Sequence, residues 1–214
     1  MRISSSVIKV AGLVALAAAV VVAATAYAPR AWAEGSPSVV KIAARNGGFR
    51  LHRNGETYFI KGVGGSGSLD LLAACGGNSV RTWGADNLGP LLDDAQKRGI
   101  TVTVGIWLGH KEHGFDYDNA DQVAKQYEDA RQAILKYKDH PALLMWGIGN
   151  EMEISAGADN AAVWSAVNNI AAMAHKLDPN HPTMTVIAEI GGNKVKAAPT
   201  AVPPAPTAAA TEAK

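Results

Sequence analysis

The chain has 214 residues, and its 20 lysines and arginines nearly balance its 19 aspartates and glutamates. Hydrophobic residues make up 48% of the sequence, which is the composition of an ordinary globular protein. A nucleic-acid-binding protein would carry a basic stripe with interleaved aromatic residues. The cations here are scattered singly along the chain, so we expect no nucleic-acid partner.

The N-terminus has the organisation of a secretory signal peptide. Arg2 and Lys9 form a basic start, an uncharged apolar run follows, and Ala31-Trp32-Ala33 offers a small-residue cleavage site. We therefore expect cleavage after Ala33, which removes residues 1–33 and leaves a secreted, periplasmic or extracellular protein with no stable membrane span. An uncleaved anchor is the alternative, because residues 10–28 approach the length of a short membrane-spanning helix.

The rest of the chain divides into one domain and a tail. Residues 196–214 are almost wholly alanine, proline and threonine, a composition that cannot bury a core and predicts disorder. Residues 34–195 are long enough for one domain with a sizeable core. The single cysteine, Cys75, allows no intramolecular disulfide, and its apolar neighbours predict a small buried role.

The first elements of this domain are predicted to form a β-hairpin. Asn46-Gly47 and Asn54-Gly55 interrupt apolar and β-branched runs, and Asn-Gly is among the strongest short turn signals. We expect these strands to cap one end of the structure that follows.

Strands and helices are then predicted to alternate. Apolar strand patterns cover residues 57–63, 78–84, 101–108, 142–150 and 182–190. Helical patterns cover residues 68–75, 87–100, 119–140 and 160–179. The longest helix is expected to begin at a cap, Asn119 or Asp121, and to turn four residues inward. These are Val123, Tyr127, Ile134 and Tyr137.

This alternation, with nearly continuous apolar strands, predicts a parallel sheet covered by helices. Gly62, Gly64, Gly65 and Gly67 are spaced wrongly for a dinucleotide-binding turn, which weakens the case for an open doubly wound sheet. The predicted fold class is α/β, a (β/α)8 TIM barrel preceded by a short β-hairpin. An eight-unit barrel takes about 250 residues, so we expect the barrel to be truncated after about five βα units.

Polar and aromatic residues gather where the predicted strands end, which is where catalytic residues of such barrels lie. They are Arg81, Trp83 and Asp86 after the second strand, Trp107 and His110 after the third, Asn150, Glu151 and Glu153 after the fourth, and Glu189 after the fifth. This distribution indicates an active face, with ordinary loop polarity as the alternative.

The segment KDHPALLMWGIGNE resembles the fourth-strand motif of the retaining glycoside hydrolases with (β/α)8 barrels, in which an Asn-Glu pair ends the strand. FIKGV, NSVRTWG and AQKRGITVTVGIWL fit the same pattern, most closely the barrel domain of glycoside hydrolase family 2, with a neighbouring barrel family as the alternative. The resemblance covers roughly residues 58–192. It implies a β-glycoside substrate and no cofactor, with Glu151 as general acid/base, Asn150 bound to the sugar 2-hydroxyl and Arg81 positioning the nucleophile.

Retaining hydrolysis needs an acid to protonate the leaving oxygen and a second carboxylate about 5 Å away to attack the anomeric carbon. The acid stays protonated near neutral pH when its surroundings are partly apolar. Trp83, Trp107 and Trp146 are candidates for those surroundings, with core packing as the alternative for Trp146. We count Trp83, Trp107 and His110 among the substrate-binding residues.

The sequence departs from the family pattern at the nucleophile, which in the family is a glutamate after the seventh strand. We therefore expect an incomplete hydrolase, and disfavour Glu189 or Glu153 as a substitute nucleophile. Two alternatives remain open. One is a catalytically inactive carbohydrate-binding remnant, and the other is a half barrel that forms homo-oligomers through exposed sheet edges.

Other constellations are weaker. His110, His113 and Asp116 have spacing that permits metal ligation, but a solvated loop is favoured and no metal is expected. His175 and His181 are expected to cap carbonyl groups near a helix end. No G-x-S-x-G motif or Ser-His-Asp set stands out, so esterase chemistry has little support.

Overall fold

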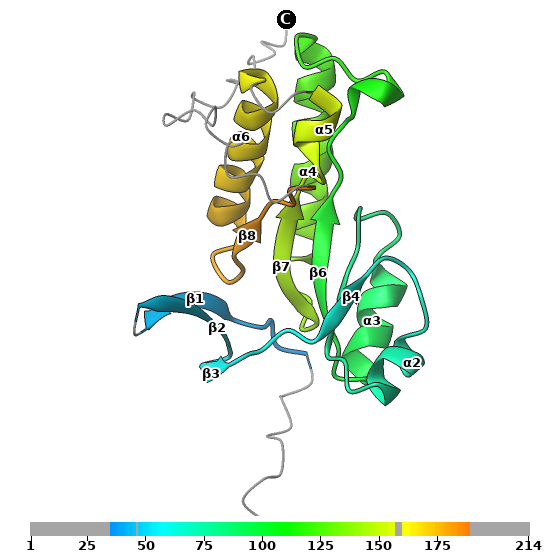
Figure 1. The fold of residues 1–214 in the computed structure, drawn as a ribbon, viewed down its shortest axis with the longest axis vertical. Coiled ribbons are helices and arrows are strands. Elements are labelled where there is room, and N and C mark those ends of the chain that lie inside the picture. Colours follow the sequence, from blue (N-terminus) through cyan, green and yellow to red (C-terminus); the bar gives the residue numbers. More distant parts are fainter. Residues whose placement is uncertain (1–34, 46, 157–159, 189–214) are drawn as a thin grey trace, which may run out of the picture. The chain divides into compact units, whose positions relative to one another are not determined.

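The computed structural model describes residues 35–45, 47–156 and 160–188. Within them, a three-stranded antiparallel sheet precedes a five-stranded parallel sheet with helices between its strands (Figure 1). The predicted signal peptide, the Pro-Ala-Thr tail and Glu189 lie outside the described residues. No helix in the described ranges is both long and apolar enough to cross a membrane.

The predicted hairpin is confirmed. It consists of β1 (Val40–Arg45), β2 (Gly48–Arg53) and the short β3 (Glu56–Thr57), paired in antiparallel order. Asn54 and Gly55 join β2 to β3 with φ angles of 52° and 87°. Two successive left-handed residues match the right-handed twist of paired strands, which explains the Asn-Gly sequence.

The hairpin caps the N-terminal end of the parallel sheet, as predicted. The Tyr58 hydroxyl donates a hydrogen bond of 2.8 Å to the Asn78 carbonyl and lies 3.0 Å from the Thr101 hydroxyl. Val40 of β1 packs in a buried cluster with Leu144 of the fourth parallel strand. Asn78, Thr101 and Leu144 all lie where parallel strands begin, so the hairpin covers that end of the sheet.

The parallel sheet follows chain order, and its strands are β4 (Gly62–Gly64), β5 (Ser79–Arg81), β6 (Thr101–Ile106), β7 (Leu143–Ile148) and β8 (Thr183–Met184). This arrangement confirms the α/β class. The first strand is shorter than predicted because the Asn78 side chain bonds the Lys61 N–H and the Phe59 carbonyl, in place of a ladder partner. The last strand is also shorter than predicted, and its two residues pair only with Trp146 and Gly147 of β7.

The helices alternate with these strands, and they are α2 (Leu69–Ala74), α3 (Gly89–Lys97), α4 (Ala120–Tyr137), α5 (Met152–Ala156) and α6 (Ala161–Leu177), with a 3-10 turn η2 (Lys111–His113) before α4. Asn119 caps α4, as its side chain accepts from the Asp121 and Gln122 N–H groups. Cys75 ends α2 at the surface, so the prediction that it is buried is wrong.

One large core cluster joins the helices to the sheet. Leu92 of α3, Ile134 of α4 and Ile170 of α6 are almost fully buried in it, together with Val102 and Val104 of β6. Burying such a side chain stabilises the fold by about 1.5–3 kcal/mol.

The inward face of α4 was predicted in part. Ile134 and Tyr137 are buried as expected, whereas Val123 and Tyr127 are only half-buried. Gln126 and Ala130 are buried on this helix as well.

The core leaves no space at Gly105 of β6. A Cβ atom there would lie 2.4 Å from the carbonyl oxygens of Thr82 and Trp83, and backbone atoms cannot yield as a flexible side chain would. We expect Gly105→Ala to lower the free energy of unfolding by more than about 2 kcal/mol, measured by urea denaturation followed by tryptophan fluorescence. Gly67→Ala is the control, because a Cβ at Gly67 meets no atom within 4 Å. Equal stability of the two variants would contradict this packing.

Candidate active site

The chain turns sharply after β7, where Gly149 and Glu151 have left-handed φ angles of 73° and 53°. A Cβ at Gly149 would approach Met152 Cγ to 2.8 Å, so the position requires glycine. The Gly149 N–H donates to the Ile106 carbonyl and the Glu151 N–H to the Val186 carbonyl, both over 2.9 Å. A left-handed non-glycine residue costs about 1–3 kcal/mol, and these two bonds hold Glu151 in that conformation.

Arg81, at the end of β5, joins Glu151 and its neighbours into one cluster. Its Nη2 donates to Asn150 Oδ1 over 2.5 Å, and its guanidinium carbon lies 4.4 Å from the centre of the Trp83 ring. Burial lowers the pKa of Arg81, while the negative charge of Glu151 acts in the opposite direction. The structure therefore brings together four of the predicted site residues, from two strand ends 69 residues apart.

Trp107 and His110 form a second group. Their rings stack with centroids 4.8 Å apart and an angle of 12°, and His113 continues the stack at 5.9 Å from His110. They line a cavity of about 520 Å³ beside α4, which Asp86 also lines. The residues Arg81, Asn150 and Glu151 are not part of its wall. The predicted site residues thus divide between a strand-end cluster and a neighbouring cavity.

The other predicted carboxylate and tryptophan of this region face inward. Glu153 is only 5% exposed, and its Oε1 accepts from the Ala188 N–H over 2.5 Å, so it is not placed to attack a substrate. Trp146 is fully buried and its Nε1–H donates to Asp178. Trp146 is therefore a core residue, which decides between the two interpretations of its role. Among the described residues, no group of three metal-binding side chains is present.

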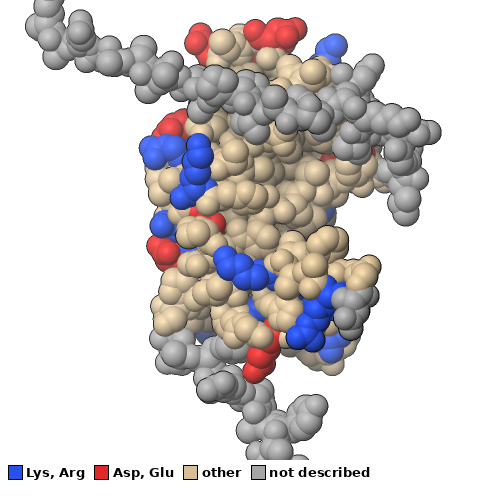
Figure 2. Space-filling model, turned by 90° about the vertical axis from the view of Figure 1, so that its left-hand side faces the viewer, with Lys and Arg blue, Asp and Glu red and all other residues tan. Residues whose placement is uncertain are grey.

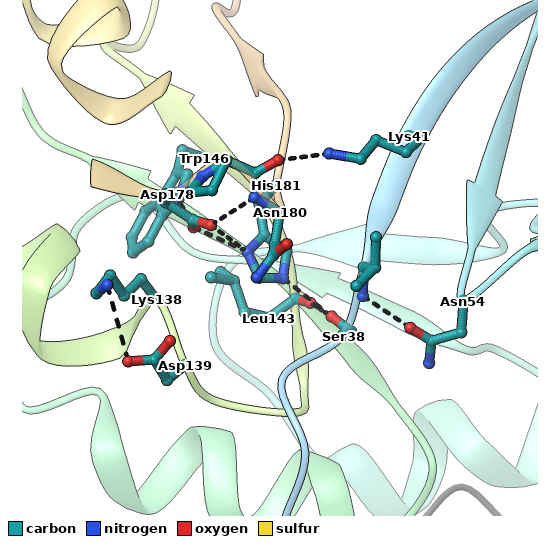
Figure 3. A network of polar contacts seen from close by, with 12 residues as sticks. Ser38, Lys41, Asn54, Lys138, Asp139, Leu143, Trp146, Asp178, Asn180 and His181 are labelled. Carbon is teal, nitrogen blue, oxygen red and sulfur yellow. Dashed lines mark hydrogen bonds and ion pairs between the residues drawn. The ribbon is translucent and has the colours of Figure 1, made fainter. Parts of the chain in front are cut away.

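A buried Ser-His-Asp network lies at the other end of the sheet, and no sequence pattern predicted it (Figure 3). Ser38 Oγ lies 3.0 Å from His181 Nε2, and His181 Nδ1 lies 2.8 Å from an Asp178 oxygen that also accepts from Trp146. The three side chains are at most 3% exposed. His181 therefore bonds to side chains, and the expectation that it caps carbonyl groups is wrong.

The network has the connectivity of a hydrolytic triad but not its function. Ser38 donates its hydroxyl proton to the Leu143 carbonyl, so its oxygen accepts from His181 Nε2. Both imidazole nitrogens are then engaged, and no basic nitrogen is left to activate the serine. The network instead fixes the segment before β1 to the start of β7 and to the loop between α6 and β8.

The Asp178 carboxylate makes this network sensitive to acid. Burial raises its pKa, but hydrogen bonds from His181 and Trp146 lower it more, so that the pKa lies below its ordinary value. Because this pKa is lower in the folded state than in the unfolded chain, the ionised carboxylate stabilises the fold at pH values above the unfolded-state pKa of about 3.9. This contribution is lost as the pH falls through the folded-state pKa.

We expect Asp178→Asn to lower the free energy of unfolding at pH 7 by about 1.5–3 kcal/mol. The difference between variant and wild type should shrink as the pH falls from about 5 to 2, because both then lack the charge. Urea titrations at several pH values measure this, with the exposed Asp118→Asn as control. A difference that does not change with pH would show that the carboxylate charge is not the stabilising feature.

Fold and site together define the class of the chain: a segment of a (β/α)8 barrel with a carboxylate held at the end of its fourth strand. The family described as glycosyl hydrolases family 2, TIM barrel domain, matches residues 69–197. The chain belongs to this family.

The chain is also similar to individual members. It is 28% identical over 163 residues to a β-glucuronidase of Paenibacillus borealis, across 65% of this chain and 27% of that protein. A family 2 glycosyl hydrolase from Bacteroides cellulosilyticus superposes with a TM-score of 0.56 at 22% identity, over 74% of this chain and 22% of that one. A β-galacturonidase from Eisenbergiella tayi superposes with a TM-score of 0.55 at 20% identity, over 71% of this chain and 29% of that one. The two structures show the shared fold, and the chain spans about a quarter of its relatives' length.

Proposed function

We propose that this chain supplies the acid/base half of a secreted β-glycoside hydrolase that acts with retention of configuration. The observation that carries the proposal is the cluster at the strand ends, in which Glu151 follows Asn150 and Asn150 is bonded to Arg81. A carboxylate fixed by its backbone at the C-terminal end of a barrel strand is where this fold places its chemistry.

In the proposed reaction, the Glu151 carboxylic acid protonates the glycosidic oxygen while a second carboxylate attacks the anomeric carbon. The bond to the leaving alcohol breaks, and a glycosyl ester remains on the second carboxylate. Glu151, now ionised, takes a proton from water, which attacks the anomeric carbon and releases the sugar. Because Asn150 Oδ1 accepts from Arg81, its amide N–H groups are left to donate to a sugar hydroxyl.

The second carboxylate is expected beside Arg81. Arg81 Nε is buried and has no hydrogen-bond partner within the described residues, and a buried donor without an acceptor is costly. A carboxylate about 5 Å from Glu151 would satisfy it and meet the spacing that retention requires. We propose that this group comes from outside the described residues, either in this chain or in a second copy of it.

The similar proteins suggest which sugars to try first. The curated relative is named a β-glucuronidase, and a structural neighbour is a β-galacturonidase bound to galacturonate. We therefore propose β-linked uronides together with neutral β-glycosides as the first substrates.

A second candidate is assembly through a sheet edge. Phe59 is 78% exposed just before β4, and Ile60 and Val63 are exposed beside it, while β4 pairs on one side only within the described residues. An apolar, unpaired edge favours contact with further strands, including those of a second copy. Light scattering tests this candidate: a dimeric mass that Phe59→Asp converts to monomer supports it, and a monomeric wild-type chain contradicts it.

The activity is tested by incubating the full chain with aryl β-glycosides and comparing Glu151→Gln with wild type. We expect wild-type turnover and a loss of about 10²–10⁴-fold in the variant, which removes only the transferable proton. Glu56→Gln is the matched control, because Glu56 is exposed on β3, in the hairpin that caps the opposite end of the strands. A folded chain that hydrolyses none of the glycosides, or equal turnover by Glu151→Gln, would contradict the proposal.

A further inference from the structure

We propose that the cavity beside Trp107 is a binding site for one neutral pyranose ring, separate from the strand-end cluster at Glu151. The sugar class rests on the proposed function, since the family acts on carbohydrates. The cavity volume of about 520 Å³ lies within the range of small-molecule sites. Its wall includes Trp107, His110 and Gln126 but not Arg81, Asn150 or Glu151.

One wall of the cavity is a fixed aromatic plane. Trp107 is 42% exposed, although it directly follows a fully buried strand, and its ring lies nearly parallel to that of His110. His113 also stacks against His110, with ring centroids 5.9 Å apart, and this contact supports the plane. A flat, rigid and partly exposed aromatic surface matches the C–H face of a pyranose and loses little conformational freedom on binding.

The remaining walls offer hydrogen-bonding groups for hydroxyls. His110 Nε2 is buried and has no hydrogen-bond partner among the described residues. Gln122 Oε1 accepts from the Asp116 N–H, which leaves the amide N–H groups of Gln122 to donate. Asp86 contributes carboxylate oxygens that accept. Donors and acceptors around an aromatic plane suit a polyhydroxylated ring better than a purely apolar ligand.

The charges in the wall favour a neutral sugar over a uronate. Lys125 Nζ lies 2.5 Å from Asp129 Oδ2, so these two opposite charges compensate each other. Asp86 makes no ion pair with any described residue, and its negative charge therefore disfavours an anionic ring. The site is thus predicted to select neutral pyranosides, whatever sugar is cleaved at Glu151.

The cavity adjoins the catalytic cluster through the backbone. Trp107 directly follows Ile106, whose carbonyl accepts from Gly149 at the turn that leads into Glu151. A sugar in the cavity would therefore lie beside the active face, and an oligosaccharide could occupy both sites.

Binding of methyl β-glucopyranoside and methyl β-glucuronide to the full chain tests this inference, by saturation-transfer NMR and tryptophan fluorescence titration. We expect saturable binding of the neutral glycoside, weakened at least about 10-fold by Trp107→Ala and largely kept by Trp107→Phe. Phe49→Ala is the matched control, since Phe49 is exposed on β2 and is not part of the cavity wall. Thermal unfolding of each variant confirms that it is folded.

Unchanged affinity in Trp107→Ala, preference for the uronide, or no saturable binding by the folded chain would overturn the inference. Glu151→Gln separates it from the proposed function. If hydrolysis is absent but binding depends on Trp107 and survives Glu151→Gln, the proposed function fails and the cavity site stands. If Glu151-dependent hydrolysis occurs without Trp107-dependent binding, the reverse holds.

Discussion

The candidate site depends on the hydrogen bond from the Glu151 N–H to the Val186 carbonyl, which crosses from the end of β7 to the segment after β8. Together with the bond from Gly149 to Ile106, it anchors the turn to the exits of both neighbouring strands. Glu151 can then hold a left-handed conformation that few non-glycine residues adopt. The direction of the carboxylate thus follows from the alignment of three parallel strands.

The two ends of the sheet have different roles. At the N-terminal end, Ser38, His181 and Asp178 form a buried network that connects the hairpin segment to β7, and Trp146 of β7 donates into it. At the C-terminal end, side chains such as Arg81 are partly exposed, and Arg81 Nε has no hydrogen-bond partner in the part of the chain that the structure describes. Barrels of this class commonly separate stability and chemistry in this way.

Figure 2, which views the side of the hairpin and α6, shows charged side chains scattered over mostly uncharged surface.

Much of the fold could be predicted because its signals are local. The apolar runs of β6 and β7, the Asn119 cap and the Asn54-Gly55 turn each depend on a few adjacent residues. The cluster of Arg81 with Asn150 could be predicted because parallel strands end at one edge of the sheet. The roles assigned to these residues stay predictions, because geometry alone does not test them.

The rest depends on contacts that sequence patterns do not record. Ser38 and His181 are 143 residues apart, and no local pattern relates them. Trp107 and His110 lie just after a strand, much as Arg81 lies at the end of one. Their rings nevertheless line a cavity beside α4, where the following η2 turn places His113 against His110. Cys75 lies at the surface because it ends a short helix. Its apolar sequence neighbours had instead predicted a buried position.

The most direct test of the role of Glu151 is the stereochemistry of azide rescue. Glu151→Ala is incubated with an activated aryl β-glycoside and sodium azide, and the anomeric configuration of the glycosyl azide is determined by NMR. If Glu151 is the acid/base of a retaining enzyme, azide replaces water at the glycosyl ester and the product is the β-azide. An α-azide would show that Glu151 is the nucleophile, and a rate unaffected by azide would contradict the acid/base assignment.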